Sequence, residues 1–405
     1  MKFLYTLIAS LFCFVIYAQQ PFVTTWEVTA GDLDITIPTN PAEYTYDYTV
    51  DFGDGTVLNN QTDDAYHTYS SPGTYTVSIS GVFPYLQASL SSYAQKIKTV
   101  GQWGDIQWQS MNYSFRNCEN LTINATDTPD LSNVNGMIEM FYNTPVNSPT
   151  LNNWDVSNVT NMERLFLDAY NFNQPLENWD VSNVENMELM FANTNNFNQP
   201  LNNWDVSSVK NMALMFNNSD YNQPLNNWDV SNVTDMRFLF LDNESFNQTL
   251  NSWDVSNVTS MRSMFENSVY NQPLNDWDVS SVTDMRSMFR NSVYNQPLNN
   301  WDVSNVTIMW GMFLDNDSFN QPLNNWDVSN VNTTGFIFSN SNFNHPLNDW
   351  DVSNVTNMAN MFSYSNFNQP LNDWNVSNVN IMYSMFKTSA FNQPLNDWDV
   401  SNVFD

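Results

Sequence analysis

One aspartate recurs in a repeated Trp-Asp-Val-Ser motif and is the main candidate for chemistry in this chain. Its copies are Asp155, Asp180, Asp205, Asp229, Asp254, Asp278, Asp302, Asp327, Asp351 and Asp399, and Asn375 interrupts the series. If the motif forms stacked strands, these carboxylates stand in a column about 4.8 Å apart. Like charges at that spacing repel, which raises their pKa values or recruits cations. The column is therefore a candidate face for calcium or a basic ligand.

A second interpretation of the same aspartates is structural. A short acidic side chain next to a turn can accept hydrogen bonds from nearby backbone amides, which satisfies each carboxylate locally. Both interpretations remain open at this stage. Calcium is the only cofactor that the sequence brings into consideration.

Enzyme chemistry finds no support elsewhere in the chain. There are two histidines, no Gly-rich phosphate loop and no pair of acids outside a repeated context, so we predict no catalytic residues. Asp51 and Asp54 lie on a Gly-rich turn that could hold calcium, but two acids there more often fix the turn itself. His67 has no nearby partner typical of catalysis or metal binding, and we expect a structural role.

The aspartates belong to units of 24 or 25 residues, a period typical of repeat architectures. In one unit the apolar residues are Leu201, Trp204, Val206, Val209, Met212, Met215 and Phe216. The alternation at Trp-Asp-Val predicts a very short strand, and the later spacing of three predicts a helical or 3₁₀ turn. An all-helical repeat is rejected because the recurring prolines leave too few residues for two helices.

The predicted fold is a repeat solenoid, a leucine-rich-repeat-like horseshoe with short parallel strands and helical or 3₁₀ turns, preceded by a small immunoglobulin-like β-sandwich. Between units lies Phe/Tyr-Asn-Gln-Pro, where we expect the aromatic ring to fill the core and the asparagines to form a ladder. Thr334 and Gly335 replace a methionine and its neighbour, which predicts a thin core near Phe338.

The region 21–84 alternates in the manner of half-buried strands separated by turns. Its Phe-Gly-Asp-Gly-Thr, His-Thr-Tyr and Pro-Gly-Thr-Tyr-Thr-Val stretches resemble the polycystic-kidney-disease (PKD) type of immunoglobulin-like domain. That resemblance implies a spacer or protein-contact module of a secreted protein. Residues 85–128 are expected to be a connector with an N-terminal capping repeat, and 129–405 the array, whose last unit is incomplete.

The pattern F-N-Q-P-L-x-x-W-D-V-S-x-V-x-x-M-x-x-M-F resembles the BspA-like leucine-rich-repeat surface proteins over about residues 95–405. This resemblance implies an exported surface protein that works in adhesion or protein binding, without specifying the ligand. Because the chain ends within a unit, we expect either a fragment of a longer protein or an end that docks on a partner.

Composition and the N-terminus indicate an extracellular setting. Lys2 followed by an apolar run to Ile16 and by Ala18 predicts an export signal over residues 1–18. This run is too short to span a bilayer comfortably, and no other apolar run approaches its length. Lipid attachment at Cys13 is disfavoured by the bulky residues before it. After cleavage Cys118 is the one cysteine, expected to be a buried thiol. A net charge of −31 argues against nucleic acid and anionic membranes as partners.

The outward positions hardly vary between units, so the predicted surface is a repeated lattice. Such a surface favours an extracellular protein or a polymeric glycan as partner, or self-association, with avidity across units. The function predicted from the sequence is that of a secreted or cell-surface, non-enzymatic protein that binds through a repetitive acidic face. The alternative is a calcium-stabilised or self-associating matrix protein.

Overall fold

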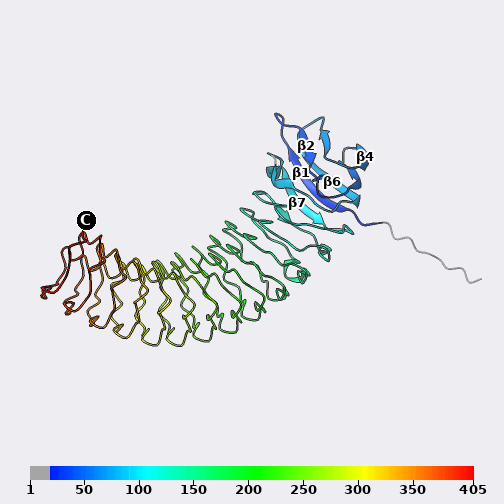
Figure 1. Ribbon diagram of the computed structural model, residues 1–405. Helices are drawn as coiled ribbons and strands as arrows, with labels where there is room; N and C mark the ends of the chain where they lie inside the picture. Colours follow the sequence, from blue (N-terminus) through cyan, green and yellow to red (C-terminus); the bar gives the residue numbers. More distant parts are fainter. Residues whose placement is uncertain (1–18, 91) are drawn as a thin grey trace, which may run out of the picture.

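The computed structural model describes residues 19–90 and 92–405. The predicted export signal and Cys13 lie outside these residues. A β-sandwich at the N-terminal end leads into a long curved stack of coils that runs to the C-terminus (Figure 1). We refer to residues 103–405 as the coil stack.

The sandwich consists of two antiparallel sheets of short strands. Its strands are β1 (Phe22–Val28), β2 (Asp34–Ile37), β3 (Asp47–Asp51), β4 (Val57–Gln61), β5 (Ala65–Thr68) and β6 (Gly73–Val82). Strands β2 and β5 form the small sheet, and the large sheet has the order β4-β3-β6-β1-β7-β8. Rings such as Trp26, Tyr48 and Phe83 fill the space between the sheets and are 1% exposed. The predicted β-sandwich is confirmed.

The large sheet continues from the sandwich into the first coil. The segment expected to be a connector contains η1 (Ala88–Leu90), η2 (Ser92–Gln95), β7 (Ile97–Gln102) and β8 (Thr122–Ile123). Strand β7 pairs antiparallel with β1 of the sandwich on one side and parallel with β8 of the stack on the other. The sandwich therefore covers the first coil through shared backbone hydrogen bonds.

The inward residues of the coils are those that the repeat pattern predicts. In the coil that ends at Phe216 all seven apolar positions are buried, with exposures between 0% and 3%. The first coil follows the same pattern, since Trp103, Trp108, Met111 and Phe115 are also buried. The predicted burial of the aromatic ring at the Phe/Tyr-Asn-Gln-Pro joints is confirmed as well. Phe172 is fully buried, and its ring centroid lies 4.1 Å from that of Phe166.

The backbone of one coil bonds to the next along the stretch that contains the two methionines. We call this stretch the ladder segment, which is 160–169 in one coil and begins two residues before the first methionine. Alternate amides at Met162, Arg164, Phe166 and Asp168 donate to carbonyls of the following coil at 2.8–3.1 Å. The amides between them close turns within the coil, such as Leu165 N–H to the Met162 carbonyl at 3.2 Å. Both sets of donors are thereby satisfied without a helix.

Residues in the left-handed conformation make this alternation possible. Each ladder segment has two of them, for example Arg164 at φ 55° and Asp168 at φ 60°. The second position is mostly asparagine or aspartate, whose short side chains tolerate a positive φ. The first position accepts Tyr, Glu, Arg, Leu, Phe, Ser or Asn, and only Gly311 there is free of the steric cost.

The predicted horseshoe with helical turns is wrong. In the described residues the helical elements are η1, η2 and η3 (Leu151–Asn153), and no ladder segment contains one. The left-handed residues reverse the backbone every few positions, so the spacing of three comes from consecutive turns and not from a 3₁₀ helix. The predicted strand at Trp-Asp-Val is wrong too, because the parallel bridges lie at the residue before the first methionine, such as Asn161 to Asn186.

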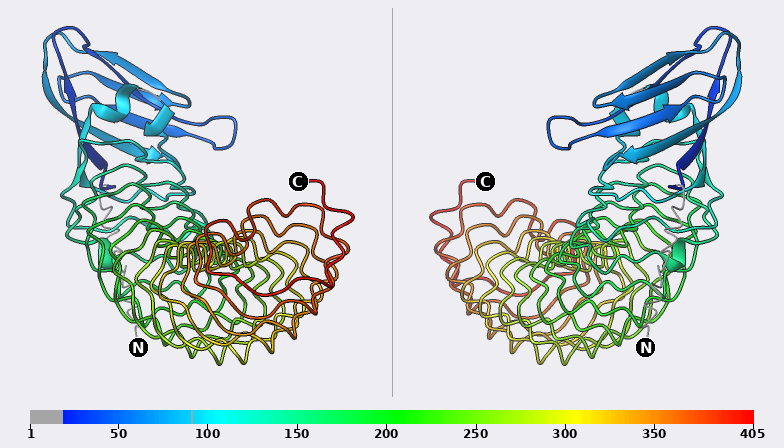
Figure 2. Two further views of the ribbon diagram at one scale, coloured as in Figure 1. Left: turned by 90° about the vertical axis from the view of Figure 1, so that its left-hand side faces the viewer. Right: turned by 90° about the vertical axis from the view of Figure 1, so that its right-hand side faces the viewer.

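The coil stack curves with its ladder segments on the inside of the arc. Paired backbones repeat at about 4.8 Å. The phenylalanine that follows the second methionine repeats at 5.7–5.8 Å through the middle of the stack. The tryptophan rings repeat at 6.3–6.5 Å. Because the spacing grows from the ladder to the tryptophans, we infer that the ladder face is concave. Figure 2 shows the arc of the stack.

Candidate functional site

The recurring aspartates lie on the outer, tryptophan side of the coils, and each one closes a turn. Asp155 Oδ1 accepts the Ser157 backbone N–H at 3.1 Å and the Ser157 hydroxyl at 2.6 Å. The backbone bond recurs at 3.0–3.1 Å for the other nine predicted aspartates. The side chains are exposed. The structural interpretation of these aspartates is therefore confirmed: they are acceptors for the serine two residues on.

Asn375, the exception in the series, makes the same turn. Its Oδ1 accepts the Ser377 N–H at 3.2 Å and the Ser377 hydroxyl at 2.8 Å. An amide oxygen has no negative charge, yet the local geometry is retained. The turn therefore requires a side-chain oxygen at this place and not a charge.

The electrostatics of the column differ from the expectation drawn from stacked strands. The adjacent tryptophans repeat at 6.3–6.5 Å, which is wider than 4.8 Å. At such a distance two exposed charges in water repel by about 0.6 kcal/mol. Hydrogen bonds from the serine hydroxyl and from the serine backbone N–H lower the pKa of Asp254, Asp302, Asp351 and Asp399. For these four, hydrogen bonding outweighs the effect of partial burial, which raises the pKa, and the expected rise in pKa is wrong.

Removing one of these acceptors is expected to destabilise its coil slightly. Asp302→Ala leaves the Ser304 N–H without its acceptor at 3.0 Å, and we expect a loss of about 0.5–1 kcal/mol. Asp302→Asn is the matched control and should lose less than the alanine variant at pH 7, since it keeps the acceptor oxygen, as Asn375 does naturally, and gives up only the contribution of the charge. Denaturant unfolding at pH 7 measures both variants. Equal losses in the two variants would show that the charge matters and not the oxygen.

The lowered pKa values predict a loss of stability in acid. A carboxylate whose pKa is lower in the folded chain than its usual 3.8 stabilises the fold when ionised, and this contribution disappears as the pH falls through the folded-state pKa. The melting temperature should therefore fall below about pH 4. A variant with asparagine at Asp254, Asp302 and Asp351 should show a shallower fall than the natural chain. An identical pH dependence would contradict the assignment of these shifts.

The acidic turn of the sandwich has the same kind of role. Asp51 Oδ1 accepts the Gly53 N–H and Asp54 Oδ1 the Thr56 N–H, both at 2.9 Å. His67 Nε2 lies 2.8 Å from Asp54 Oδ2, and its ring packs between Phe52 and Tyr69 with centroids 4.5 Å away. These contacts confirm the turn-fixing role of the two aspartates and the structural role of His67.

The polar side chains of the joints and the buried cysteine also have structural roles. The predicted asparagine ladder is confirmed, because Asn173 Oδ1 accepts the Asn198 backbone N–H at 3.1 Å and the Gln199 side-chain amide at 3.0 Å. His345, which replaces glutamine, places its Nε2 at 2.9 Å from the Asn320 carbonyl. Cys118 is fully buried, and burial raises the pKa of its thiol.

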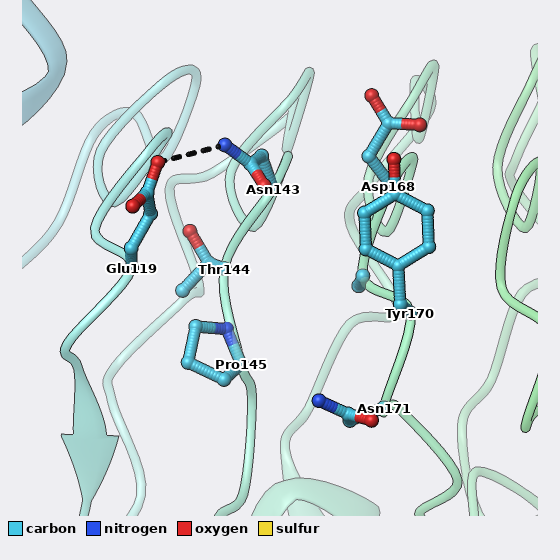
Figure 3. A pocket seen from close by; sticks show the side chains of 8 residues that line it. Glu119, Asn143, Thr144, Pro145, Asp168, Tyr170 and Asn171 are labelled. Atoms are coloured by element: carbon cyan, nitrogen blue, oxygen red, sulfur yellow. Dashed lines mark hydrogen bonds between the residues drawn. The ribbon is translucent and has the colours of Figure 1, made fainter.

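A small polar hollow of about 230 Å³ lies at one edge of the early coils (Figure 3). Its Glu119 accepts the Asn143 side-chain amide at 3.3 Å, and its Asp168 accepts that of Asn193 at 2.6 Å. The negative charge of Asp168, with partial burial, raises the pKa of the Tyr170 hydroxyl. A tyrosine in that state is a hydrogen-bond donor and a poor nucleophile, so the hollow offers polar contacts to a ligand.

The concave face carries the differences between coils, which the sequence interpretation missed. All eight lysines and arginines of the coil stack lie in ladder segments: Arg116, Arg164, Lys210, Arg237, Arg262, Arg286, Arg290 and Lys387. The exposed aspartates stand on the opposite, outer side. The repeated lattice expected for the whole surface is therefore found on the outer side only. The signal was available in the sequence, because the residues between the two methionines change from unit to unit.

Most of these cations have a carboxylate partner. Arg116 and Arg164 contact Glu139, Lys210 contacts Glu185 at 2.8 Å, and Arg290 contacts Glu266 at 3.3 Å. Arg237 and Arg286 each bond the aspartate two residues before them. Arg262 instead lies over the ring of Phe238, with its guanidinium carbon 5.2 Å from the ring centroid. No carboxylate of the described chain lies within ion-pair distance of Arg262.

A PKD-like sandwich whose sheet continues into turn-built coils defines an all-β, non-helical class of repeat protein. Comparison with family profiles agrees with both parts. Residues 15–82 match the PKD domain. Residues 109–221, 201–293, 268–364 and 335–405 match the family described as "Mycoplasma protein of unknown function, DUF285". These matches together span 109–405, and the chain belongs to the DUF285 family. Comparisons with curated proteins and with solved structures give no match.

Proposed function

We propose that this chain is an exported, non-enzymatic surface protein whose coil stack binds an extracellular protein or glycan. A PKD domain followed by DUF285 repeats fits a surface repeat protein. The resemblance of the repeats to BspA-like surface proteins supports adhesion as the purpose of binding. In the described residues no helix is long and apolar enough to cross a membrane.

The observation that carries this proposal is a difference between the two faces of the coils: the outer face has repeated structural side chains, and the concave face has side chains that vary. The outer aspartates, tryptophans and joint asparagines are used in bonds between or within coils, such as Trp204 Nε1–H to the Leu176 carbonyl at 3.0 Å. The concave face has side chains that differ from coil to coil. Some of them pair across coils, as Arg164 does with Glu139, while Trp310 and Arg262 line a groove. Curved repeat stacks use such faces as extended binding surfaces. Binding through the concave face therefore replaces the repetitive acidic face as the favoured mode.

The test is retention of the exported chain on immobilised matrix proteins and glycans. We expect saturable binding that is unchanged when the outer column is altered by Asp180→Asn, Asp205→Asn and Asp229→Asn together. A requirement for those carboxylates would restore the acidic face as the binding surface. Absence of retention on every protein and glycan surface would refute the proposal.

Calcium is the basis of the alternative, a metal-stabilised or self-associating matrix protein. Within the described residues no group of three or more histidine, cysteine, aspartate or glutamate side chains is arranged to hold a metal ion. The measurement is the melting temperature and the sedimentation coefficient with calcium and with a chelator. A reversible rise of both with calcium would favour the alternative over ligand binding.

A further inference from the structure

A groove of about 580 Å³ crosses the concave face in the second half of the coil stack. It is lined by side chains of ladder segments from successive coils: Arg262, Arg286, Ser287, Ile308, Trp310, Thr333, Thr356, Asn357 and Ile381. The lining combines one large aromatic ring, two arginines, two isoleucines and several hydroxyl or amide groups. Pockets for small molecules have this composition, an apolar surface with a few placed polar groups.

The groove exists because two coils depart from the repeat. Gly335 replaces the larger residue found after the first methionine, and a Cβ there would meet Trp310 Cδ1 at 3.2 Å and Asn357 Oδ1 at 3.4 Å. Thr334, in place of that methionine, is fully buried and bonds the Met361 sulfur at 3.5 Å. Phe338 keeps normal stacking at 5.8 and 5.9 Å to its neighbours. The prediction of a thin core near Phe338 is therefore wrong, and the hollow lies on the concave surface.

Trp310 provides an aromatic wall for this hollow. Its ring is half-buried and contacts the ring of Phe336 at a centroid distance of 5.2 Å and an interplanar angle of 50°. Every other tryptophan from Trp154 to Trp374 belongs to the buried column, with exposures of 2–3%. A tryptophan on the surface of a groove offers a flat apolar face to a ligand ring.

The polar groups around Trp310 include donors for which the described part of the chain provides no partner. Thr333 Oγ1 is a buried oxygen that has no hydrogen-bond partner among the described residues. Arg262 has its guanidinium over Phe238 and no carboxylate in ion-pair range, whereas Arg286 is held by Asp284 at 2.6 Å. A guanidinium in this state pairs readily with one carboxylate. Among the described residues of the coil stack, Lys387, which lies over the ring of Tyr364, also has no carboxylate in ion-pair range, but only Arg262 lines the groove. One such cation in the groove of a chain of net charge −31 favours a ligand with one carboxylate over a polyanion.

We propose that this groove binds an oligosaccharide that carries one carboxylate, such as a uronic or sialic acid residue. The apolar face of one sugar ring stacks on Trp310, the carboxylate pairs with Arg262, and sugar hydroxyls bond Thr333, Thr356 and Asn357. Hydroxyl and amide groups both donate and accept, which matches the donor and acceptor character of sugar hydroxyls. This inference rests on the proposed binding function and names its ligand class and position.

Two pairs of probes test the assignment on the exported chain by calorimetry: 3′-sialyllactose with lactose, and cellobiouronic acid with cellobiose. We expect the acidic member of at least one pair to bind at least tenfold more tightly than its neutral partner. Trp310→Ala should weaken binding at least tenfold, and Arg262→Gln should abolish the preference for the acid. Arg290→Gln is the matched control, since Arg290 lies on the same face outside the groove and should leave affinity unchanged.

Three results would overturn the proposal: no binding of any probe at millimolar concentration, equal binding of acidic and neutral members, or acid binding that both groove variants leave intact. Circular dichroism and melting temperature check that the variants fold. If Trp310→Ala does not fold, Arg262→Gln still tests the proposal. If the whole chain still adheres to matrix surfaces while these probes fail, the sugar assignment is wrong and the proposed function stands. Loss of adhesion on all surfaces refutes the proposed function itself.

Discussion

Phe289→Ala is expected to destabilise the middle of the coil stack by about 3–5 kcal/mol. Phe289 is fully buried and stacks between Phe265 at 5.8 Å and Phe313 at 5.7 Å. It also lies 4.1 Å from the ring of Tyr294 in its own coil. Alanine would leave a cavity bordered by three aromatic rings that are held in place by backbone ladders, so the coils cannot close over it.

The Phe289→Ala variant also predicts which coils are destabilised. In a stack where each coil contacts only its neighbours, stability is a sum of local terms, and a defect weakens the coils around it. Hydrogen exchange should therefore accelerate in the ladder segments near residues 259–316 and change little in the sandwich. Phe238→Ala is the control, because that ring is half-exposed on the concave face and its loss should cost about 1 kcal/mol or less. Uniform acceleration over the whole chain would show that the stack unfolds as one unit.

The burial pattern of the coils could be predicted from sequence because it follows from spacing alone. Leucine, tryptophan, valine, methionine and phenylalanine at fixed offsets repeat often enough to identify the inward face without knowledge of the backbone. The same holds for the joints, where a stacked asparagine has one geometry that satisfies both its side chain and the next backbone amide. Position in the repeat determined these features, and the structure confirms them.

The backbone path could not be predicted in the same way. The left-handed residues that create the ladder include Leu189, Leu214 and Phe238, residue types that give no sign of a positive φ. Their cost is offset by bonds to the neighbouring coil, which exist only in the assembled stack. Tertiary context thus overrides local preference, and a spacing of three was interpreted as a helical turn.

The candidate site was missed for a related reason. Attention to what repeats leads to the aspartates, which are structural, while a ligand-binding face of a repeat protein consists of the positions that do not repeat. Trp310 and Gly335 occur once each at their places in the unit, and Arg262 is distinguished by the partner that it lacks. The first two differences are visible in the sequence, and the third requires coordinates.

The junction between the sandwich and the coil stack gives the second large prediction. Gly104 has φ 66°, and a Cβ there would lie 2.4 Å from the carbonyl oxygens of Gln20 and Pro21. Its amide bonds the Asp127 carboxylate at 2.8 Å, so the loop cannot move away freely. We expect Gly104→Ala to cost about 2–5 kcal/mol, the sum of left-handed strain and overpacking, measured by thermal and denaturant unfolding.

Gly55→Ala separates these two contributions. Gly55 has φ 97°, and no heavy atom lies within 4 Å of a Cβ built there, so this variant has the backbone strain without the clash. We expect about 1–2 kcal/mol for it, confined to the sandwich turn. Gly104→Ala should in addition expose β1 and β7 to hydrogen exchange together, because displacing residues 20–21 pulls on the strand that pairs with both β6 and β7. If β7 stayed protected while β1 opened, the first coil would not depend on the sandwich, and the shared sheet would not be what caps the stack.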